Sequence, residues 1–442
     1  MFNQQRTKPG NGPIVNRTSP SQPLGDLPIK LALLLVYMVF AILLNSVGTV
    51  IQQSINSLGA TARSAAYLDS FKDLPVAVVS FLAAAMLPRF GYRRGMMMAL
   101  AAVGAMCIAA PLIPSFWTMK LLFAMVGASF AIGKVAVYST IGLLTTDQRS
   151  HGSLTTLIEA MFQIGVFAGA WLFSAFIDNN DPQSLAWFHV YWIIAAIIGV
   201  IILLLAVSDL DESAAQSERE SPAQDFIAML KLVPKQLVLV FIASAFLYVL
   251  IEQGISTWLP TFNNKVMHLP AAMSVQAASI FFGSLAVGRL LASAMLRRLG
   301  WYVLLNVSLV AMAGLVALSL PLAEGLTIGA DTTWFNAPLA AFLFPLIGLF
   351  MGPIYPVMCS TLLSALPKSD HAPMMGLIVV FSALGGTTGS FVTGRVFAAF
   401  DGALAFYLLL VPMGILTLSL FLFRRTVAVT EPSPSLEPNL VH

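Results

Sequence analysis

Roughly twelve apolar stretches run through this chain, each close to the ~20 residues that an α-helix needs to cross a membrane. They lie at about residues 30–52, 65–88, 95–113, 116–143, 153–176, 187–207, 237–259, 272–296, 301–320, 337–363, 373–398 and 403–423. Of the 442 residues, 58% are hydrophobic and 10% are charged, whereas soluble domains carry about 25% charged residues. We therefore expect an all-α membrane protein.

Two short sequences in the chain nearly repeat each other. Residues 82–91 read LAAAMLPRFG and residues 291–300 read LASAMLRRLG, and each closes an apolar segment with basic residues and a glycine. Further matches follow in register, among them Gly127 with Gly348. A copy about half a chain away predicts two related six-helix halves.

Polar segments divide the chain into five parts. We expect a disordered cytoplasmic tail over residues 1–28, an N-terminal bundle over 29–207, a cytoplasmic linker over 208–236, a C-terminal bundle over 237–424 and a second cytoplasmic tail over 425–442. Within the linker, residues 226–232 are apolar enough for a short surface helix.

The Lys and Arg residues concentrate in the tails, the linker and the loops on one side of the predicted membrane. Positive charge stays in the cytoplasm, so both termini are expected there, in a bacterial-type inner membrane. The net charge of +3 is small, and no basic run with interleaved aromatic residues indicates nucleic acid. Cys107 and Cys359 are isolated thiols, which fit neither a disulfide framework nor a metal site. We expect no cofactor.

Two six-helix repeats, a charged central loop and a Gly-plus-basic turn between the second and third helices resemble the major facilitator superfamily. That resemblance implies twelve transmembrane helices in two pseudo-symmetric bundles, a small-molecule substrate held near the midplane, and alternating access. It also implies a monomer whose partners are lipids, its substrate and protons as the coupling ion. The turn, PRFGYRR at residues 88–94, lacks the acidic residue of the family's loop motif.

Within the superfamily, residues 248–259 (YVLIEQGISTWL) and the pair Gly288 and Arg289 are similar to the fucose-permease-like sugar:proton symporters. The resemblance implies a sugar-like substrate. One position departs from that branch, because Lys134 stands where those symporters tend to place an acidic residue. A proton-carrying role therefore does not transfer to this position.

An ionisable side chain in a membrane helix is a functional hypothesis by default, because its desolvation is costly without a partner or water. Glu252 is the first choice of proton carrier, and Glu159, Asp69 and Asp73 are further candidates for proton coupling. Lys134 lies ~15 Å from the cytoplasmic end of its helix at 1.5 Å per residue.

A pair between Lys134 and Glu159 would be either structural or a site where substrate or proton competes for one partner. Asp69 and Asp73 share a helix face with Lys72 nearby. They are read as an outer-gate salt-bridge set, a solvated rim or a binding site.

Amide, hydroxyl and aromatic side chains suit a hydroxyl-rich ligand, since an aromatic ring can stack on a sugar face. The candidate substrate-binding residues are Asn45, Gln52, Gln53, Lys134, Tyr138, Glu252, Gln253, Ser256, Trp258 and Tyr355. The candidate gating residues are Arg89, Arg93, Arg94, Arg289, Pro353 and Pro356. Pro353 and Pro356 should also kink the tenth membrane helix.

These patterns favour a secondary transporter that takes up a small polar, sugar-like solute by proton symport. One alternative is a transporter or exporter of an organic anion, a siderophore or a drug-like compound, motivated by Lys134 and Arg289. Others are a transport-inactive membrane sensor and a membrane enzyme acting on lipids. The sequence contains no Walker-type phosphate loop, metal-binding His and Glu pair or nucleophile elbow, so we do not expect an enzyme.

Overall fold

The computed structural model describes residues 27–145, 148–210, 212, 229–323, 332–367, 370–400 and 402–430. Most of the two predicted tails and most of the predicted linker lie outside these residues. The short surface helix expected at residues 226–232 is described only from residue 229, and residues 229–232 are helical.

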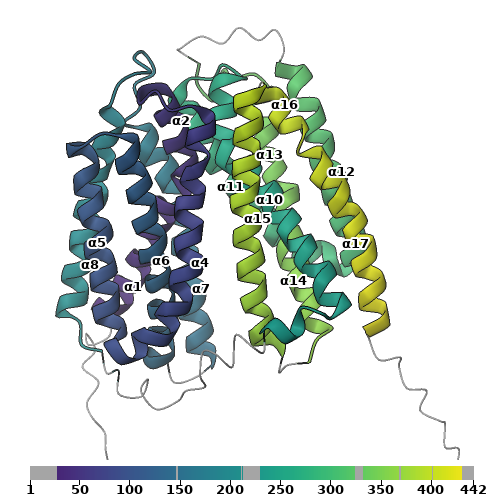
Figure 1. Cartoon of the computed structure of the whole chain (residues 1–442), viewed down its shortest axis with the longest axis horizontal. Helices are drawn as coiled ribbons and strands as arrows, with labels where there is room; N and C mark the ends of the chain where they lie inside the picture. Colours follow the sequence, from purple (N-terminus) through teal and green to yellow (C-terminus); the bar gives the residue numbers. More distant parts are fainter. Residues whose placement is uncertain are drawn as a thin grey trace, which may run out of the picture.

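The first half of the chain forms a bundle of long helices, coloured purple to teal in Figure 1. Its elements are α1 (Leu27–Asn45), α2 (Val47–Ser57), α3 (Ala62–Ala65), α4 (Tyr67–Phe90), α5 (Tyr92–Leu112), α6 (Phe116–Leu144), α7 (Gln148–Ser174), the 3-10 helix η1 (Ala186–His189) and α8 (Val190–Val207). Extensive packing joins α4 to α6, α1 to α7 and α5 to α6.

The second half forms another bundle, coloured teal to yellow in Figure 1. Its elements are α10 (Gln236–Lys265), α11 (Ala271–Leu299), α12 (Trp301–Ala323), α13 (Ala340–Met351), α14 (Ile354–Ser364), α15 (His371–Ala399), α16 (Gly402–Tyr407) and α17 (Leu410–Thr430). Here α10 packs on α15 and α17, and α11 packs on α13.

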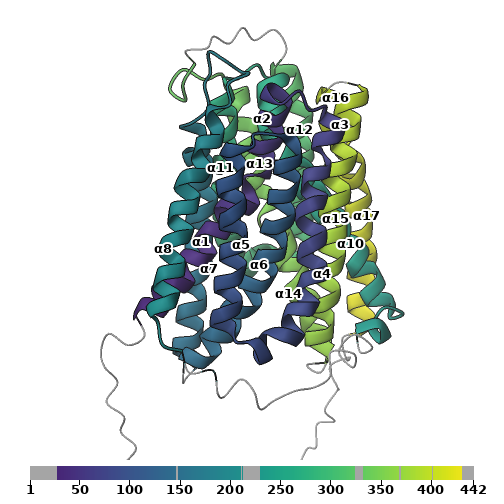
Figure 2. The ribbon, with the colours of Figure 1, turned by 60° about the vertical axis from the view of Figure 1, so that its left-hand side comes forward.

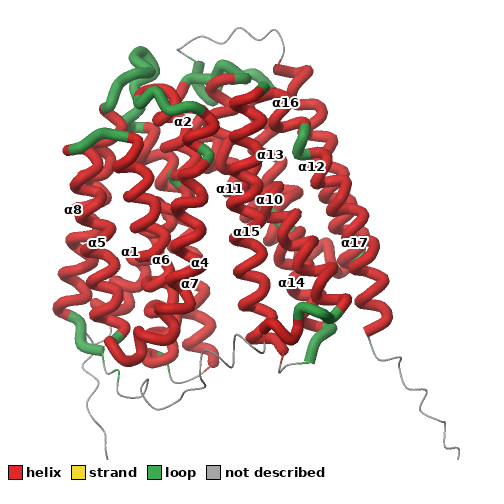
Figure 3. Tube along the Cα trace, viewed as in Figure 1, coloured by secondary structure: helices red, strands yellow, loops and turns green. Residues whose placement is uncertain are grey.

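Among the described residues, eleven helical spans are long and apolar enough to cross a membrane. The helix α4 is not one of them, and it carries the charged residues Asp69, Lys72 and Asp73. It nevertheless runs the height of the first bundle beside α6, as Figures 1 and 2 both show. Together with the eleven spans, α4 completes the expected twelve-helix, all-α fold. Figure 3 shows the described residues as helices joined by short loops.

Three membrane spans are broken, and the twelfth is interrupted at residues 408 and 409, between α16 and α17. The tenth is interrupted at Gly352 and Pro353, between α13 and α14, which confirms the predicted kink. The first is interrupted at Ser46, between α1 and α2. There the backbone N–H and the hydroxyl of Ser46 both donate to the carbonyl of Leu43. The breaks in the first and twelfth spans were not predicted.

The two bundles contact each other through α2 and α10, α3 and α15, α4 and α15, and α7 and α11. The residues that make these contacts lie toward one end of the bundles, where the loops at residues 58–66 and 266–270 are found. We call this end the side opposite the linker. The start of α1 and the end of α17 both lie on the linker side (Figure 1).

Candidate functional site

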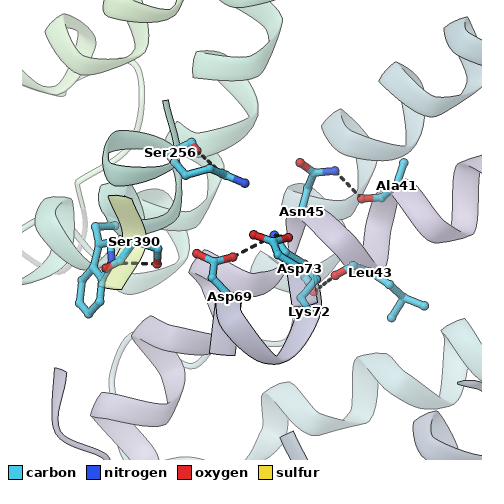
Figure 4. Close-up of polar contacts among 11 residues, drawn as sticks. Ala41, Leu43, Asn45, Asp69, Lys72, Asp73, Ser256 and Ser390 are labelled. Carbon is cyan, nitrogen blue, oxygen red and sulfur yellow. Dashed lines mark hydrogen bonds and ion pairs between the residues drawn. The ribbon is translucent and has the colours of Figure 1, made fainter. Parts of the chain in front are cut away.

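A charged triad is buried in α4. The Lys72 ammonium lies 2.9 Å from an Asp69 carboxylate oxygen and 3.6 Å from an Asp73 carboxylate oxygen. Asp69 and Lys72 share a helix face because they are three residues apart, and Figure 4 shows the triad with its ion pairs. The residue Asp69 is 0% exposed and Lys72 is 5% exposed. Two carboxylates thus share one ammonium in a buried site.

The triad lies where α4 meets the second bundle. A Cβ atom on Gly386 of α15 would be 3.5 Å from Asp73 Oδ2 and 3.1 Å from Gln253 Cγ. Ser256, one turn along α10, donates a hydrogen bond to Gln253 Oε1 over 3.1 Å. The structure therefore brings Asp73, Gln253 and Ser256 together, and the glycine makes room for that approach.

A second cluster surrounds Glu252 inside the second bundle. The carboxylate is half-buried, and Tyr248 lies one turn before it on α10, with its hydroxyl donating to the Met351 carbonyl over 3.3 Å. Arg289 is the cation of α11 whose charge acts on Glu252. The ring of Tyr248 stacks on Tyr355, with centroids 5.5 Å apart. The Tyr355 hydroxyl lies 3.0 Å from the Ser382 hydroxyl. Arg289 itself is exposed.

A third cluster lies in the first bundle, around Tyr138 of α6. The Tyr138 hydroxyl donates a hydrogen bond to Glu159 of α7, and its ring meets the edge of Tyr37 at 5.9 Å. Lys134 and Glu159 are both exposed.

The possible ion pair between Lys134 and Glu159 is not formed, and their charged groups are more than 4.0 Å apart. Instead Tyr138, one turn along the same helix, reaches Glu159. The Lys134 ammonium lies 5.9 Å from the centroid of the Phe130 ring.

Four other predicted binding residues are enclosed to different degrees. Asn45 donates to its own helix, at the carbonyl of Ala41, and lines a cavity of ≈ 10 Å³ with α7 and α11 residues rather than with Glu252. Gln52 and Gln53 are buried where the bundles meet. Trp258 is 0% exposed.

The ring of Trp258 is held within the second bundle. Its indole N–H donates to the Ser390 carbonyl over 2.9 Å, and the ring stacks on Phe397 at 5.4 Å. This packing occupies the ring that was expected to stack on a solute. In this arrangement Trp258 contributes to the contact between α10 and α15.

The predicted gating residues of the turn between α4 and α5 lie around Glu212, which follows α8 in the chain. Glu212 accepts hydrogen bonds from the backbone N–H groups of Tyr92 (3.1 Å) and Arg93 (2.9 Å). The Arg93 side chain donates to the Ala206 carbonyl over 2.6 Å. Arg89 and Arg94 line a cavity of ≈ 550 Å³ together with Arg93 and Glu212.

Glu212 was missed in the sequence, although a signal for it existed. The loop motif at residues 88–94 lacks its acid, and the structure supplies a carboxylate to this turn from the linker. A Cβ on Gly91 would be 2.7 Å from Glu212 Oε2, and the backbone φ of Gly91 is +100°. Both facts favour glycine at this turn.

The remaining gating candidates lie in the second bundle. Pro353 is buried at the break between α13 and α14, and Pro356 is exposed one turn later. Beside the break, α11 and α13 approach closely, since a Cβ on Gly288 would be 2.0 Å from the Leu349 carbonyl oxygen. Arg289 follows directly on this contact.

Two bundles of membrane-spanning helices, with ionisable groups buried where the bundles meet, are typical of a polytopic membrane transporter. The family model of the Major Facilitator Superfamily matches residues 31–334. The chain therefore belongs to this superfamily, as its motifs had suggested, and it is a membrane transporter rather than an enzyme.

Several solved structures share this fold. The chain is similar to a mutant of the nucleoside transporter NupG, with a TM-score of 0.72, 15% identity, and coverage of 89% of this chain and 99% of that one. A D-xylose-proton symporter matches with a TM-score of 0.70 and 11% identity, over 92% of this chain and 99% of that one. The FucP transporter in its outward conformation matches with a TM-score of 0.56 and 15% identity, over 92% of this chain and 99% of that one. No curated protein sequence matches the chain.

Proposed function

We propose that this transporter moves a small polar, sugar-like solute, coupled to protons, by alternating access between its two bundles. The observation that carries the proposal is the charged triad of α4. Two carboxylates share one ammonium where the first bundle meets α15. One proton would neutralise that site, and movement of the bundles would change its surroundings.

The polar side chains at the bundle contact support a neutral, hydroxylated solute. Gln253 and Ser256 lie together beside Asp73, and Gln52 and Gln53 are buried in α2, which packs against α10. Amides and hydroxyls both donate and accept hydrogen bonds, as sugar hydroxyls do. We also propose Asn45, Tyr138 and Tyr355 as residues that bind the solute.

Glu252 remains the first candidate for the proton carrier. Its charge interacts with Arg289 and Tyr248. Protonation of Glu252 would release Arg289 from that interaction, and Arg289 is among the proposed gating residues. Glu159, which accepts a hydrogen bond from Tyr138, is a second candidate carboxylate and lies in the first bundle. Coupling then passes through Glu252, Glu159 and the triad.

We place the linker side in the cytoplasm of an inner membrane, following the distribution of Lys and Arg. The bundles contact each other on the opposite side, so the described state is closed toward the outside. Opening there, with closure on the linker side, would complete alternating access in a monomer. Arg89, Arg93 and Arg94 would act at that closure, and Pro353 and Pro356 at the break in the tenth span.

A second candidate is transport of an organic anion. Lys134 and Arg289 are both exposed cations in membrane helices, and two cations facing one cavity would attract a carboxylate or a siderophore. A transport-inactive sensor would bind a solute without moving it across the membrane.

The test is uptake by purified protein in liposomes, with an imposed pH gradient and a clamped membrane potential. D-xylose, L-fucose, uridine and citrate are supplied in turn as radiolabelled probes. We expect accumulation of a sugar or nucleoside that is abolished when the pH gradient is collapsed. Accumulation of citrate alone would overturn the sugar-like assignment in favour of an organic anion, and specific binding without flux would overturn transport.

A further inference from the structure

An apolar groove lies on the first bundle between α4 and α5. Both helices pack extensively on α6 but contact each other little, so the surface between them is hollowed. The groove has a volume of ≈ 320 Å³ and is lined by Val79, Leu82, Ala83, Met86, Leu87, Phe90, Gly95, Met98 and Ile132. All of these residues are apolar, and the chain is a membrane protein, so lipid is the natural occupant.

A glycine lies at the base of this groove. A Cβ on Gly95 would be 2.2 Å from Leu87 Cδ2 and 3.7 Å from Ile132 Cγ2. The sequence repeat aligns Gly91 with Gly300 and therefore Gly95 with Leu304, and Leu304 is buried. The first bundle thus has no side chain at a position where the second bundle has a leucine.

The length of the groove matches one acyl chain. Its α4 residues begin at Val79 and end at Phe90, at spacings that keep them on one helix face. At 1.5 Å per residue this distance is ~16 Å, and half of a hydrocarbon core of ~30 Å is ~15 Å. The groove therefore extends through about one leaflet of the membrane.

A basic cavity begins where the groove ends. Phe90, the last residue of α4, lines both the groove and the cavity of ≈ 550 Å³ that contains Arg89, Arg93, Arg94 and Glu212. The cavity lies at the linker-side turn between α4 and α5. Positive charge thus meets the apolar groove at the level expected for lipid headgroups.

The charged groups of this cavity differ in how they are engaged. The Glu212 carboxylate accepts two backbone N–H groups, and the Arg93 side chain donates to the Ala206 carbonyl over 2.6 Å. Arg89 and Arg94 are exposed, and within the described ranges neither forms an ion pair. Two guanidinium groups therefore remain for an anion, and guanidinium groups bind phosphate through paired hydrogen bonds.

We propose that the groove and the basic cavity together bind one anionic phospholipid from the leaflet on the linker side. One acyl chain lies in the groove, and the phosphate lies beside Arg89 and Arg94. Basic pockets between membrane helices bind anionic lipid headgroups in this way. A free phosphate would use the cavity alone and leave the groove unoccupied. The lipid lies outside the contact between the bundles, so its binding does not depend on which solute is transported.

The experiment is native mass spectrometry of the full, delipidated chain, titrated with dioleoyl phosphatidylglycerol or with dioleoyl phosphatidylcholine. The two lipids share their acyl chains and differ in net charge. Arg89→Gln with Arg94→Gln removes two cations from the proposed site. The matched control is Arg297→Gln with Arg298→Gln, at the equivalent turn of the second bundle, where a basic cavity of ≈ 520 Å³ is found. All four arginines are exposed, so both double variants should fold.

The native chain should bind phosphatidylglycerol more tightly than phosphatidylcholine. Loss of Arg89 and Arg94 should weaken phosphatidylglycerol binding about tenfold or more, since each cation near an anionic lipid contributes about a factor of five. The control pair should retain most of the affinity. Equal affinity for the two lipids, or equal losses in the two double variants, would overturn the headgroup site.

Met98→Gln tests the groove, because it places an amide among apolar groups. Val307→Gln is its control, since Val307 is the equivalent residue of the second bundle and both side chains are exposed, Met98 by 61% and Val307 by 48%. Met98→Gln should weaken phosphatidylglycerol binding about threefold or more, and Val307→Gln should not. Equal effects of the two changes would place the acyl chain elsewhere and overturn the groove.

Competition separates a lipid from other occupants. Glycerol 3-phosphate at the concentration of the lipid should not displace phosphatidylglycerol, because it lacks acyl chains. Displacement would assign the cavity to a free phosphate and overturn the lipid. A dimer that forms without lipid and is lost in Met98→Gln would place a second copy of the chain on the groove, which would also overturn the proposal.

Discussion

The carbonyl oxygen of Lys72 lies 2.1 Å from the position that a Cβ atom would occupy on Gly127. This contact joins the backbones of α4 and α6. The second bundle repeats it, because a Cβ on Gly348 of α13 would be 2.3 Å from the Phe281 carbonyl oxygen of α11. The close approach also fixes the charged triad, since Lys72 is one of its members.

Gly127→Ala should destabilise the protein, because the added Cβ meets a backbone atom that cannot turn away. We expect a cost of ~1–3 kcal/mol, as for other overpacked sites. Thermal unfolding followed by fluorescence-detected size exclusion measures it. Gly199→Ala is the control, since a Cβ there meets nothing within 4 Å. Equal stability of the two variants would contradict this packing.

Lys72→Met should be strongly destabilising, because it leaves Asp69 and Asp73 without their shared cation. Loss of one partner from a buried ion pair costs ~3–5 kcal/mol. Adding Asp69→Asn and Asp73→Asn should recover part of that loss in the same unfolding assay.

Lys235→Met provides the comparison for the triad. Lys235 pairs with Asp370 at 2.7 Å, but its side chain is 48% exposed. Exposed pairs contribute about 0–1 kcal/mol, so this variant should unfold close to the native chain. A Lys72→Met variant as stable as Lys235→Met would show that the triad is not a buried, coupled site.

Tyr138→Phe and Glu159→Gln should affect transport non-additively. Each change weakens the same hydrogen bond between α6 and α7, so the double variant should be little worse than the poorer single variant. The measurement is a double-mutant cycle on kcat/KM for uptake, with an expected coupling of ~0.5–3 kcal/mol. Fully additive losses would mean that the two residues act separately.

Glu212→Ala should loosen the start of α5. The carboxylate caps the N–H groups of Tyr92 and Arg93, and loss of an N-terminal cap costs about 0.5–2 kcal/mol. Hydrogen exchange at these two amides should accelerate, while Glu212→Gln should retain part of the protection through its amide oxygen. Unchanged exchange in Glu212→Ala would show that Glu212 does not cap these two N–H groups.

Hydropathy and the internal repeat were sufficient to predict the twelve-helix fold, because lipid forces each apolar stretch into a helix. The break at Gly352 and Pro353 followed from proline chemistry. The break at Ser46 did not, since serine is common within helices and its bonds to Leu43 depend on local geometry. Local rules thus predicted the elements better than their interruptions.

The candidate site was harder to predict, because it depends on which side chains contact each other in the folded structure. Depth alone favoured Lys134 as the partner of Glu159, yet Tyr138 makes that contact. Trp258 reads as a sugar-stacking residue, but Phe397 and Ser390 occupy its ring and N–H.

The central claim is proton-coupled solute transport, and the most direct measurement is proton movement triggered by solute. Proteoliposomes carrying a pH dye are challenged in turn with D-xylose, L-fucose, uridine and citrate, for the native chain and for Glu252→Gln. We predict that a sugar or nucleoside alkalinises the external medium with the native chain, and that Glu252→Gln abolishes this signal. Solute accumulation without any proton signal would contradict the coupling, and an unchanged signal in Glu252→Gln would remove Glu252 as the carrier.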